Sequence, residues 1–326
     1  MENYRKRCAE YRGWKKGYYQ LVSDGWQKGR LFHSSAQFMY GMMTIGLMQL
    51  KFGLRIYAFI LMPNHIHIVL SGSGNACVEA FSYFKKRISA RLSKDSDPPL
   101  PRDYGFKLLP IADKQQMRKH LLYVLRNAYE KGWCTPLGYP WGSGWSLYSQ
   151  MAPFIRGVRA GTLSKRKMES LIGSETAVPA DWEFHPALGL LPDSFVDTSL
   201  IRKLFPTVKQ FFTRLVKDYE SFAQIADEAG EDLLLSEEEV RDIVSHLLNT
   251  QFNHKTVEQL GADEKYSLAA LLNHAFHLPP ETVAQTLSLP EHIVKQVLRS
   301  KEYGLRPDFQ ALHSPRPRNP AGNARK

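Results

Sequence analysis

The stretch RIYAFILMPNHIHIVL, residues 55–70, decides the fold of the N-terminal half. Two apolar runs flank the turn-forming pair Pro63-Asn64, which is the pattern of a β-hairpin. On the second strand His65 and His67 point to one face of the sheet, while Ile66 points to the other face, where a core would lie. Two imidazoles placed in this way can ligate one divalent metal. By spacing alone, however, two ordinary structural histidines are the more common explanation.

Further elements surround this hairpin. Residues 18–22 are a strand candidate, and apolar residues recur at helical spacing over 37–50, 76–92 and 112–131. Helices that alternate with strands around a central hairpin predict an α+β fold, in which a small antiparallel sheet carries helices on one side. Beyond residue 197 only helical spacing remains, so the C-terminal half is expected to be mostly α-helical.

A tyrosine and an asparagine share one face of the helix predicted at 112–131. Tyr123 and Asn127 are four residues apart, and His120 lies one turn earlier. A tyrosine hydroxyl has an ordinary pKa near 10 and is a weak nucleophile at neutral pH, unless a metal bound to the target polarises it. Asn127 offers an amide oxygen as a hard ligand. The alternative is a helix face of packing tyrosines, which a chain with 15 tyrosines makes the default.

Charge favours a polyanionic partner. The formal net charge is +11, and residues 85–126 hold eleven Lys and Arg against four Asp. Lys85, Lys86, Arg87 and Arg91 are candidate contacts to DNA phosphates, although a solvated basic surface is an equally good reading. Stretches long and apolar enough to cross a membrane are absent, no secretory signal is recognised, and the three cysteines form no paired motif. A cytoplasmic location is therefore expected.

Residues 281–298 have the pattern of a helix-turn-helix, within a unit at about 264–303. The second helix would place Lys295, Gln296 and Arg299 in a DNA groove, with His292 nearby. A helical hairpin used for packing or dimerisation is the alternative.

Three segments together resemble a known family. Residues 57–70 resemble the HUH motif region of single-tyrosine HUH transposases, similar to the transposase IS200 type and most of all to the REP-associated tyrosine transposase branch. Tyr123 to Asn127 is similar to that family's Y-x-x-x-N nucleophile motif, and residues 139–143, YPWGS, resemble its downstream Y-P-W-x-S. The order and separation of the three segments match, and they cover roughly residues 15 to 150.

This resemblance implies a ferredoxin-like palm, a nickase and strand transferase that acts on hairpin-bearing single-stranded DNA in DNA transposition and recombination. It implies His65, His67 and Asn127 as ligands of Mg²⁺ or Mn²⁺. It also implies Tyr123 as the nucleophile that forms a 5′-phosphotyrosine. The family continues from its asparagine as N-P-x-R-A-G, whereas this chain reads NAYEKG. This departure leaves His120 as the alternative third ligand, with Tyr129 as a fallback nucleophile on a different helix face.

The domain organisation expected from these patterns has four parts. They are a catalytic HUH domain at 1–155, a linker at 156–195, a helical domain at 196–305, and a basic disordered tail at 306–326. The partner is DNA, and a nucleoid-associated location in the cytoplasm follows. Both a monomer and a homodimer are open.

Two other functions compete with this one. A non-catalytic, sequence-specific DNA-binding regulator derived from a transposase would bind DNA without cutting it. A phosphoesterase that acts on small molecules through the H-x-H pair would leave the basic residues and Tyr123 without a role.

Overall fold

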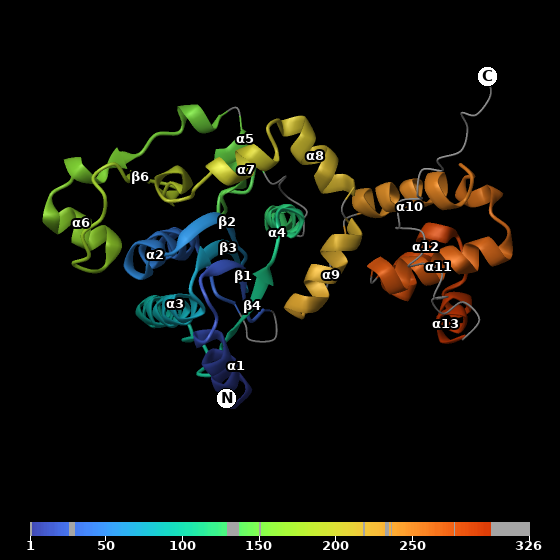
Figure 1. The fold of residues 1–326 in the computed structure, drawn as a ribbon, viewed down its shortest axis with the longest axis horizontal. Coiled ribbons are helices and arrows are strands. Elements are labelled where there is room, and N and C mark those ends of the chain that lie inside the picture. The colour runs from blue at the N-terminus through green and yellow to red at the C-terminus, as the bar shows by residue number, and fades with distance from the viewer. Residues whose placement is uncertain are drawn as a thin grey trace, which may run out of the picture. The chain divides into compact units, whose positions relative to one another are not determined.

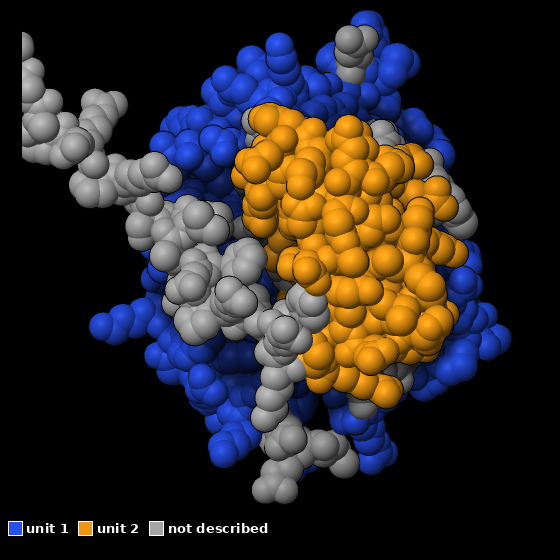
Figure 2. All heavy atoms as spheres, turned by 90° about the vertical axis from the view of Figure 1, so that its right-hand side faces the viewer, with its two compact units in different colours: residues 1–236 blue, residues 237–326 orange. Residues whose placement is uncertain are grey.

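The computed structural model describes residues 2–25, 30–128, 137–149, 151–217, 219–231, 235, 237–276 and 278–300. The chain forms two compact units, residues 1–236 and 237–326, which Figure 2 colours separately. Figure 1 labels most of the elements. Those of the first unit are α1 (Glu2–Arg12), β1 (Gly17–Ser23), α2 (Ser35–Phe52), β2 (Arg55–Leu61), β3 (Ile66–Gly72), α3 (Gly74–Lys94), β4 (Phe106–Ile111), α4 (Lys114–Arg126), α5 (Gly144–Tyr148), β5 (Val158–Arg159), α6 (Lys165–Ile172), β6 (Glu183–His185), β7 (Gly189–Leu190), α7 (Ser199–Leu204), α8 (Val208–Lys217) and α9 (Tyr219–Ala229), with short 3₁₀ turns at Ala152–Phe154, Ala160–Thr162 and Pro192–Ser194.

Strands β1 to β4 form one sheet in the order β2-β3-β1-β4, and every neighbouring pair is antiparallel. The predicted hairpin is confirmed: β2 pairs with β3, and Leu61 lies opposite Ile66 beside the turn. Together with the many helices, this sheet confirms the α+β class.

The two faces of the sheet carry different side chains. Ile66, Ile68 and Leu70 of β3 join the main hydrophobic core together with residues of α2 and α3. His67 falls on the opposite face because side chains alternate along a strand. Helix α4 packs against β2 and β3 on that face (Figure 1). Helices thus cover both faces, rather than the one face expected from the sequence, and the histidine face is the one that α4 covers.

Residues 156–195, expected to be a linker, are part of the first unit. Strands β5, β6 and β7 form a second antiparallel sheet, and Trp182 and Leu190 join the main core. The absence of a side chain at Gly46 of α2 permits this close packing, since a Cβ there would lie 3.2 Å from the Trp182 ring and nearer still to Leu190. The observed boundary between units therefore falls after residue 236, later than the sequence indicated.

The second unit consists of helices. They are α10 (Glu237–Gln251), α11 (Ala262–Phe276), α12 (Pro280–Leu287) and α13 (Glu291–Arg299), with a 3₁₀ turn at Val257–Gln259. Ser288 adopts a left-handed conformation, with φ of 52°, and ends α12. Buried Val283, Leu287 and Val294 pack α12 and α13 on α11. Helix α13 coincides with the predicted second helix of the helix-turn-helix, and the predicted tail at 306–326 lies outside the described residues.

Within the described residues, no helix is both long and apolar enough to span a membrane.

Candidate active site

Both histidines are buried: His67 lies on β3, and His65 is the residue just before this strand. His67 is fully buried and His65 is 8% exposed, and their ring centroids lie 4.7 Å apart. Nδ1 of His65 is 3.0 Å from Oδ1 of Asn64, and Nδ1 of His67 is 3.4 Å from Nε2 of Gln20. Because these contacts engage the Nδ1 atoms, the Nε2 atoms are the ones that face the site. Burial lowers the pKa of His67 to about 3, so this imidazole is neutral at neutral pH, the form that binds a metal.

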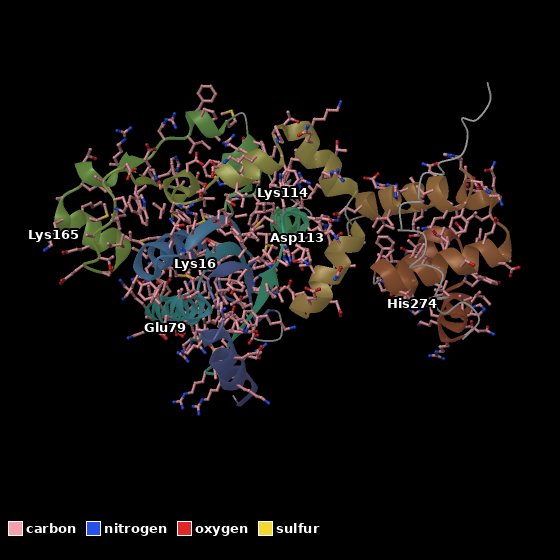
Figure 3. All side chains as sticks on the ribbon, in the orientation of Figure 1. Lys16, Glu79, Asp113, Lys114, Lys165 and His274 are labelled. Atoms are coloured by element: carbon pink, nitrogen blue, oxygen red, sulfur yellow. The ribbon has the colours of Figure 1, made fainter. Side chains whose placement is uncertain are left out.

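Tyr123 reaches the same place from α4. This helix begins after Asp113, whose carboxylate accepts a hydrogen bond of 2.8 Å from the backbone N–H of Gln116. Figure 3 labels Asp113 and Lys114 at this end of the helix. Tyr123 is buried, and its ring centroid lies 5.6 Å from that of His67. The fold therefore brings together the tyrosine and the histidine that the sequence singled out on separate elements.

A third group, Glu231, completes the cluster from the end of α9. Gly230 has a φ of 74°, and the N–H of Glu231 donates to the carbonyl of Ala226 at 2.9 Å. This helix-ending turn favours glycine, and it directs the Glu231 side chain toward β3. Tyr123 Oη donates a hydrogen bond of 2.8 Å to Oε2 of Glu231. Oε1 of Glu231 lies 3.7 Å from Nε2 of His65, and Oε2 of Glu231 lies 3.5 Å from Nε2 of His67.

The donor atoms of this cluster fit a divalent cation. The two histidine nitrogens and a Glu231 oxygen lie within 4.8 Å of one another. Ligand atoms that bind one ion at about 2.1 Å lie about 3.0–3.4 Å from one another. The two histidine nitrogens and the Glu231 oxygen lie slightly farther apart than this. Nε2 of His67 and Oε1 of Glu231 are buried and make no hydrogen bond within the described part of the chain. Burial raises the pKa of the Glu231 carboxyl, whereas nearby His65 and Tyr123 lower it. The His65–His67–Glu231 cluster can therefore hold a metal.

The two candidates for a third ligand from α4 have different surroundings. Nδ2 of Asn127 donates to the Tyr123 carbonyl at 2.9 Å, and Oδ1 of Asn127 is a buried acceptor with no hydrogen bond among the described residues. Nδ1 of His120, by contrast, lies 2.7 Å from Oε1 of Gln20. Asn127 thus retains an uncommitted oxygen, whereas His120 is engaged by Gln20. Tyr129, the fallback nucleophile, lies outside the described residues.

The YPWGS segment supports the edge strand β2. Tyr139 Oη donates to the Leu61 carbonyl at 2.7 Å, and the N–H of Phe59 donates to Ser143 Oγ at 3.0 Å. Gly142 forms an isolated antiparallel bridge with Ile60. These contacts satisfy backbone groups of β2 that no neighbouring strand pairs. The segment thereby stabilises the hairpin that carries the histidines.

The basic residues of α3 lie on the other side of the sheet. Arg87 is buried; its guanidinium donates to the Ile172 carbonyl and stacks 4.8 Å from the Tyr40 ring. Lys85 donates to backbone carbonyls at 2.6 and 2.8 Å, and Arg91 pairs with Asp95 at 2.7 Å. Among these four predicted DNA contacts, Lys86 alone is exposed. The structure therefore does not bring this basic set to the histidines.

The predicted contacts of the second unit lie at its surface. Lys295, Gln296 and Arg299 of α13 are exposed. Lys295 pairs with Glu291 at 2.5 Å, a surface ion pair that a phosphate could replace at small cost.

Two residues of the site were not found from the sequence. Glu231 is 108 residues from Tyr123 and belongs to no local motif. Gln20 gave a signal, since it is a lone polar residue within the apolar strand YYQLV, and such a residue in a central strand must find a buried partner.

Comparisons with known proteins yield one solved structure. It is described as a REP-associated tyrosine transposase bound to a REP hairpin. The likeness has 17% sequence identity and a TM-score of 0.33, and it covers 40% of this chain and 79% of that chain. No family model and no curated protein sequence matches the chain.

Proposed function

We propose that the chain is a metal-dependent single-strand DNA endonuclease and strand transferase of the HUH tyrosine type, acting on hairpin-bearing DNA in transposition. One observation carries the proposal. The Tyr123 hydroxyl and the Nε2 atoms of His65 and His67 all converge on the carboxylate of Glu231, at 2.8, 3.7 and 3.5 Å. A nucleophile beside a ligand cluster is the arrangement that phosphodiester cleavage requires.

The fold supports the same class. From β1 to β4 the chain runs strand, helix, strand, strand, helix, strand, and the sheet order is β2-β3-β1-β4; both orders support a ferredoxin-like palm in this proposal. In that palm the two central strands are β3 and β1. Their buried polar residues His67 and Gln20 lie beneath α4, which carries the tyrosine.

In this proposal two imidazoles and a carboxylate form the metal site, a donor set that a divalent transition-metal ion such as Mn²⁺ can take. His65, His67 and Glu231 would hold the ion, with Asn127 Oδ1 as a further oxygen donor from α4. A bound Mg²⁺ or Mn²⁺ would polarise the scissile phosphate and offset the charge that develops on it.

The reaction then follows from the placement of Tyr123. Its oxygen attacks the phosphorus, the bond from phosphorus to the 3′ oxygen breaks, and the 5′ phosphate stays on the tyrosine while a 3′-OH leaves. Oε2 of Glu231 accepts the hydroxyl hydrogen bond; in this proposal it takes the tyrosine proton and passes it on to the leaving 3′ oxygen. Attack by another 3′-OH on the phosphotyrosine reverses the step and joins strands. No nucleotide triphosphate is consumed, because the phosphodiester bond energy is retained.

In this proposal the second unit adds a DNA contact. The exposed face of α13 with Lys295, Gln296 and Arg299 would enter a duplex groove. Lys86 of α3 would contact backbone phosphates away from the active site.

The test is a covalent adduct. The purified chain is incubated with a 5′-extended hairpin oligonucleotide and Mn²⁺, then denatured and resolved on a gel. A protein–DNA band that needs the metal, and that Tyr123→Phe abolishes while the variant stays folded, is expected. Specific binding with no adduct under Mg²⁺ or Mn²⁺ would instead favour the non-catalytic regulator.

A further inference from the structure

A buried chain of hydrogen bonds links His67 to His120 through Gln20. Gln20 lies on the central strand β1, opposite Val69 of β3 and Leu109 of β4. Its Nε2 is 3.4 Å from Nδ1 of His67, and its Oε1 is 2.7 Å from Nδ1 of His120. All three side chains are buried. The Gln20 amide therefore contacts both imidazoles: its nitrogen contacts His67 and its oxygen contacts His120.

The amide fixes where each imidazole carries its proton. An amide nitrogen donates and an amide oxygen accepts. In the observed arrangement Gln20 Nε2 donates to Nδ1 of His67, so the proton of neutral His67 sits on Nε2. Nδ1 of His120 donates to Gln20 Oε1. His67 Nε2–H then faces the Glu231 carboxylate, 3.5 Å away.

A metal bound at Nε2 of His67 requires the other tautomer, with the proton on Nδ1. Rotation of the Gln20 amide by half a turn provides it. Oε1 then accepts from Nδ1–H of His67, and Nε2 donates to Nδ1 of His120, whose proton moves to its own Nε2. Both hydrogen bonds are kept and no charge changes.

We propose that Gln20 and His120 are positioning residues for His67, and that rotation of the Gln20 amide switches both histidines between a metal-free and a metal-binding pair of tautomers. This inference rests on the proposed function, because it takes His67 as a ligand. It gives His120 a role behind the metal centre rather than in it. It also explains why an amide, which can both donate and accept, stands in the middle of an apolar strand.

The direct test reads the tautomers of the full chain by ¹⁵N NMR with ¹⁵N-labelled histidine, with and without diamagnetic Zn²⁺. In the wild type, the inference requires His67 to change from the Nε2–H to the Nδ1–H form and His120 to change in the opposite sense when Zn²⁺ binds. A His120 tautomer that stays the same while His67 takes up the ion would overturn the inference.

Two variants separate the role of the amide from that of packing. Gln20→Met removes both hydrogen bonds at similar volume, and we expect Mn²⁺ affinity, measured by electron paramagnetic resonance, to fall about tenfold or more. Gln20→Glu offers only acceptors, so Mn²⁺ affinity should be retained while His120 no longer changes tautomer. The matched control is Gln37→Met, which removes another buried glutamine on α2 and should leave Mn²⁺ affinity unchanged.

The outcomes also separate this inference from the proposed function. If His67→Ala abolishes Mn²⁺ binding but Gln20→Met leaves it intact, the metal site stands and the positioning role is wrong. If His67→Ala leaves Mn²⁺ binding intact, the proposed metal site is wrong, and the inference is overturned with it.

Discussion

The hydroxyl of Tyr123 donates a hydrogen bond of 2.8 Å to the carboxylate of Glu231. That carboxylate also lies 3.5 Å from Nε2 of His67. Tyr123 comes from α4, Glu231 from the end of α9 and His67 from β3. Three separate parts of the chain therefore come together at the carboxylate of Glu231.

Glu231→Gln should weaken metal binding and cleavage together. The amide keeps the size of the side chain but loses the charge that attracts a cation, so we expect Mn²⁺ affinity to fall on the order of tenfold or more, with slower adduct formation. Glu228→Gln, an exposed change on α9 three residues earlier, is the control and should do neither. Faster adduct formation in Glu231→Gln would instead show that the carboxylate obstructs the site.

A divalent metal should stabilise the first unit. Binding to the folded state alone raises the free energy of unfolding by about 2.7 kcal/mol at a metal concentration one hundred times Kd. Differential scanning calorimetry with increasing Mn²⁺ should therefore show a rising Tm for this unit. The rise should vanish in His67→Ala and on addition of a chelator. An equal rise in His67→Ala would place the bound metal elsewhere.

Acid should destabilise the first unit through its buried histidines. Burial lowers the pKa of His120 to about 4, below its ordinary value of about 6.5. The unfolded chain therefore binds more protons than the folded one between these values, and stability falls as pH falls through this window. For His120 alone the loss is at most about 3 kcal/mol. The free energy of unfolding, measured with a chemical denaturant, should differ less between pH 7 and pH 4.5 in His120→Gln than in the wild type. His292→Gln, at an exposed position, should behave as wild type.

Arg87→Met should affect folding more than DNA binding. The Arg87 guanidinium is buried and donates to the Ile172 carbonyl and to Thr44 Oγ1, so its loss leaves buried acceptors unpaired. We expect the free energy of unfolding to fall by about 1–3 kcal/mol, with little change in affinity for a DNA hairpin. The exposed neighbour Lys86→Met should show the reverse. For both variants, fluorescence anisotropy measures the affinity for the DNA hairpin and urea unfolding measures the stability. A large loss of DNA affinity in folded Arg87→Met would contradict the buried, structural role of Arg87.

The local patterns of the sequence predicted the hairpin and the helices well. Successive side chains of a strand point to opposite faces of the sheet. This alternation alone predicted that His67 points away from the core, on the face opposite to Ile66. Helical spacing likewise placed Tyr123 on one helix. These features depend on neighbours in the chain, which a single sequence contains.

Contacts between distant segments could not be predicted in the same way. Glu231 enters the site because Gly230 turns the chain at the end of α9 and because Phe222 packs 6.3 Å from the Tyr123 ring. The glycine marks a helix end in the sequence, but no local pattern shows that this turn faces Tyr123. Residues 156–195 looked like a linker because their strands are two or three residues long, and only the gap left by Gly46 on α2 gives Trp182 and Leu190 a place in the core.

In the proposed reaction Tyr123 becomes covalently attached to DNA. The most direct test of this attachment is peptide mapping of the adduct by mass spectrometry after nuclease and trypsin digestion. Cleavage after Lys119 and Arg126 gives the peptide HLLYVLR, residues 120–126, in which Tyr123 is the one tyrosine, while Tyr129 falls in the next peptide. We expect a 5′-phosphonucleotide on residues 120–126. A nucleotide on residues 127–131, or an adduct undiminished in folded Tyr123→Phe, would contradict this expectation.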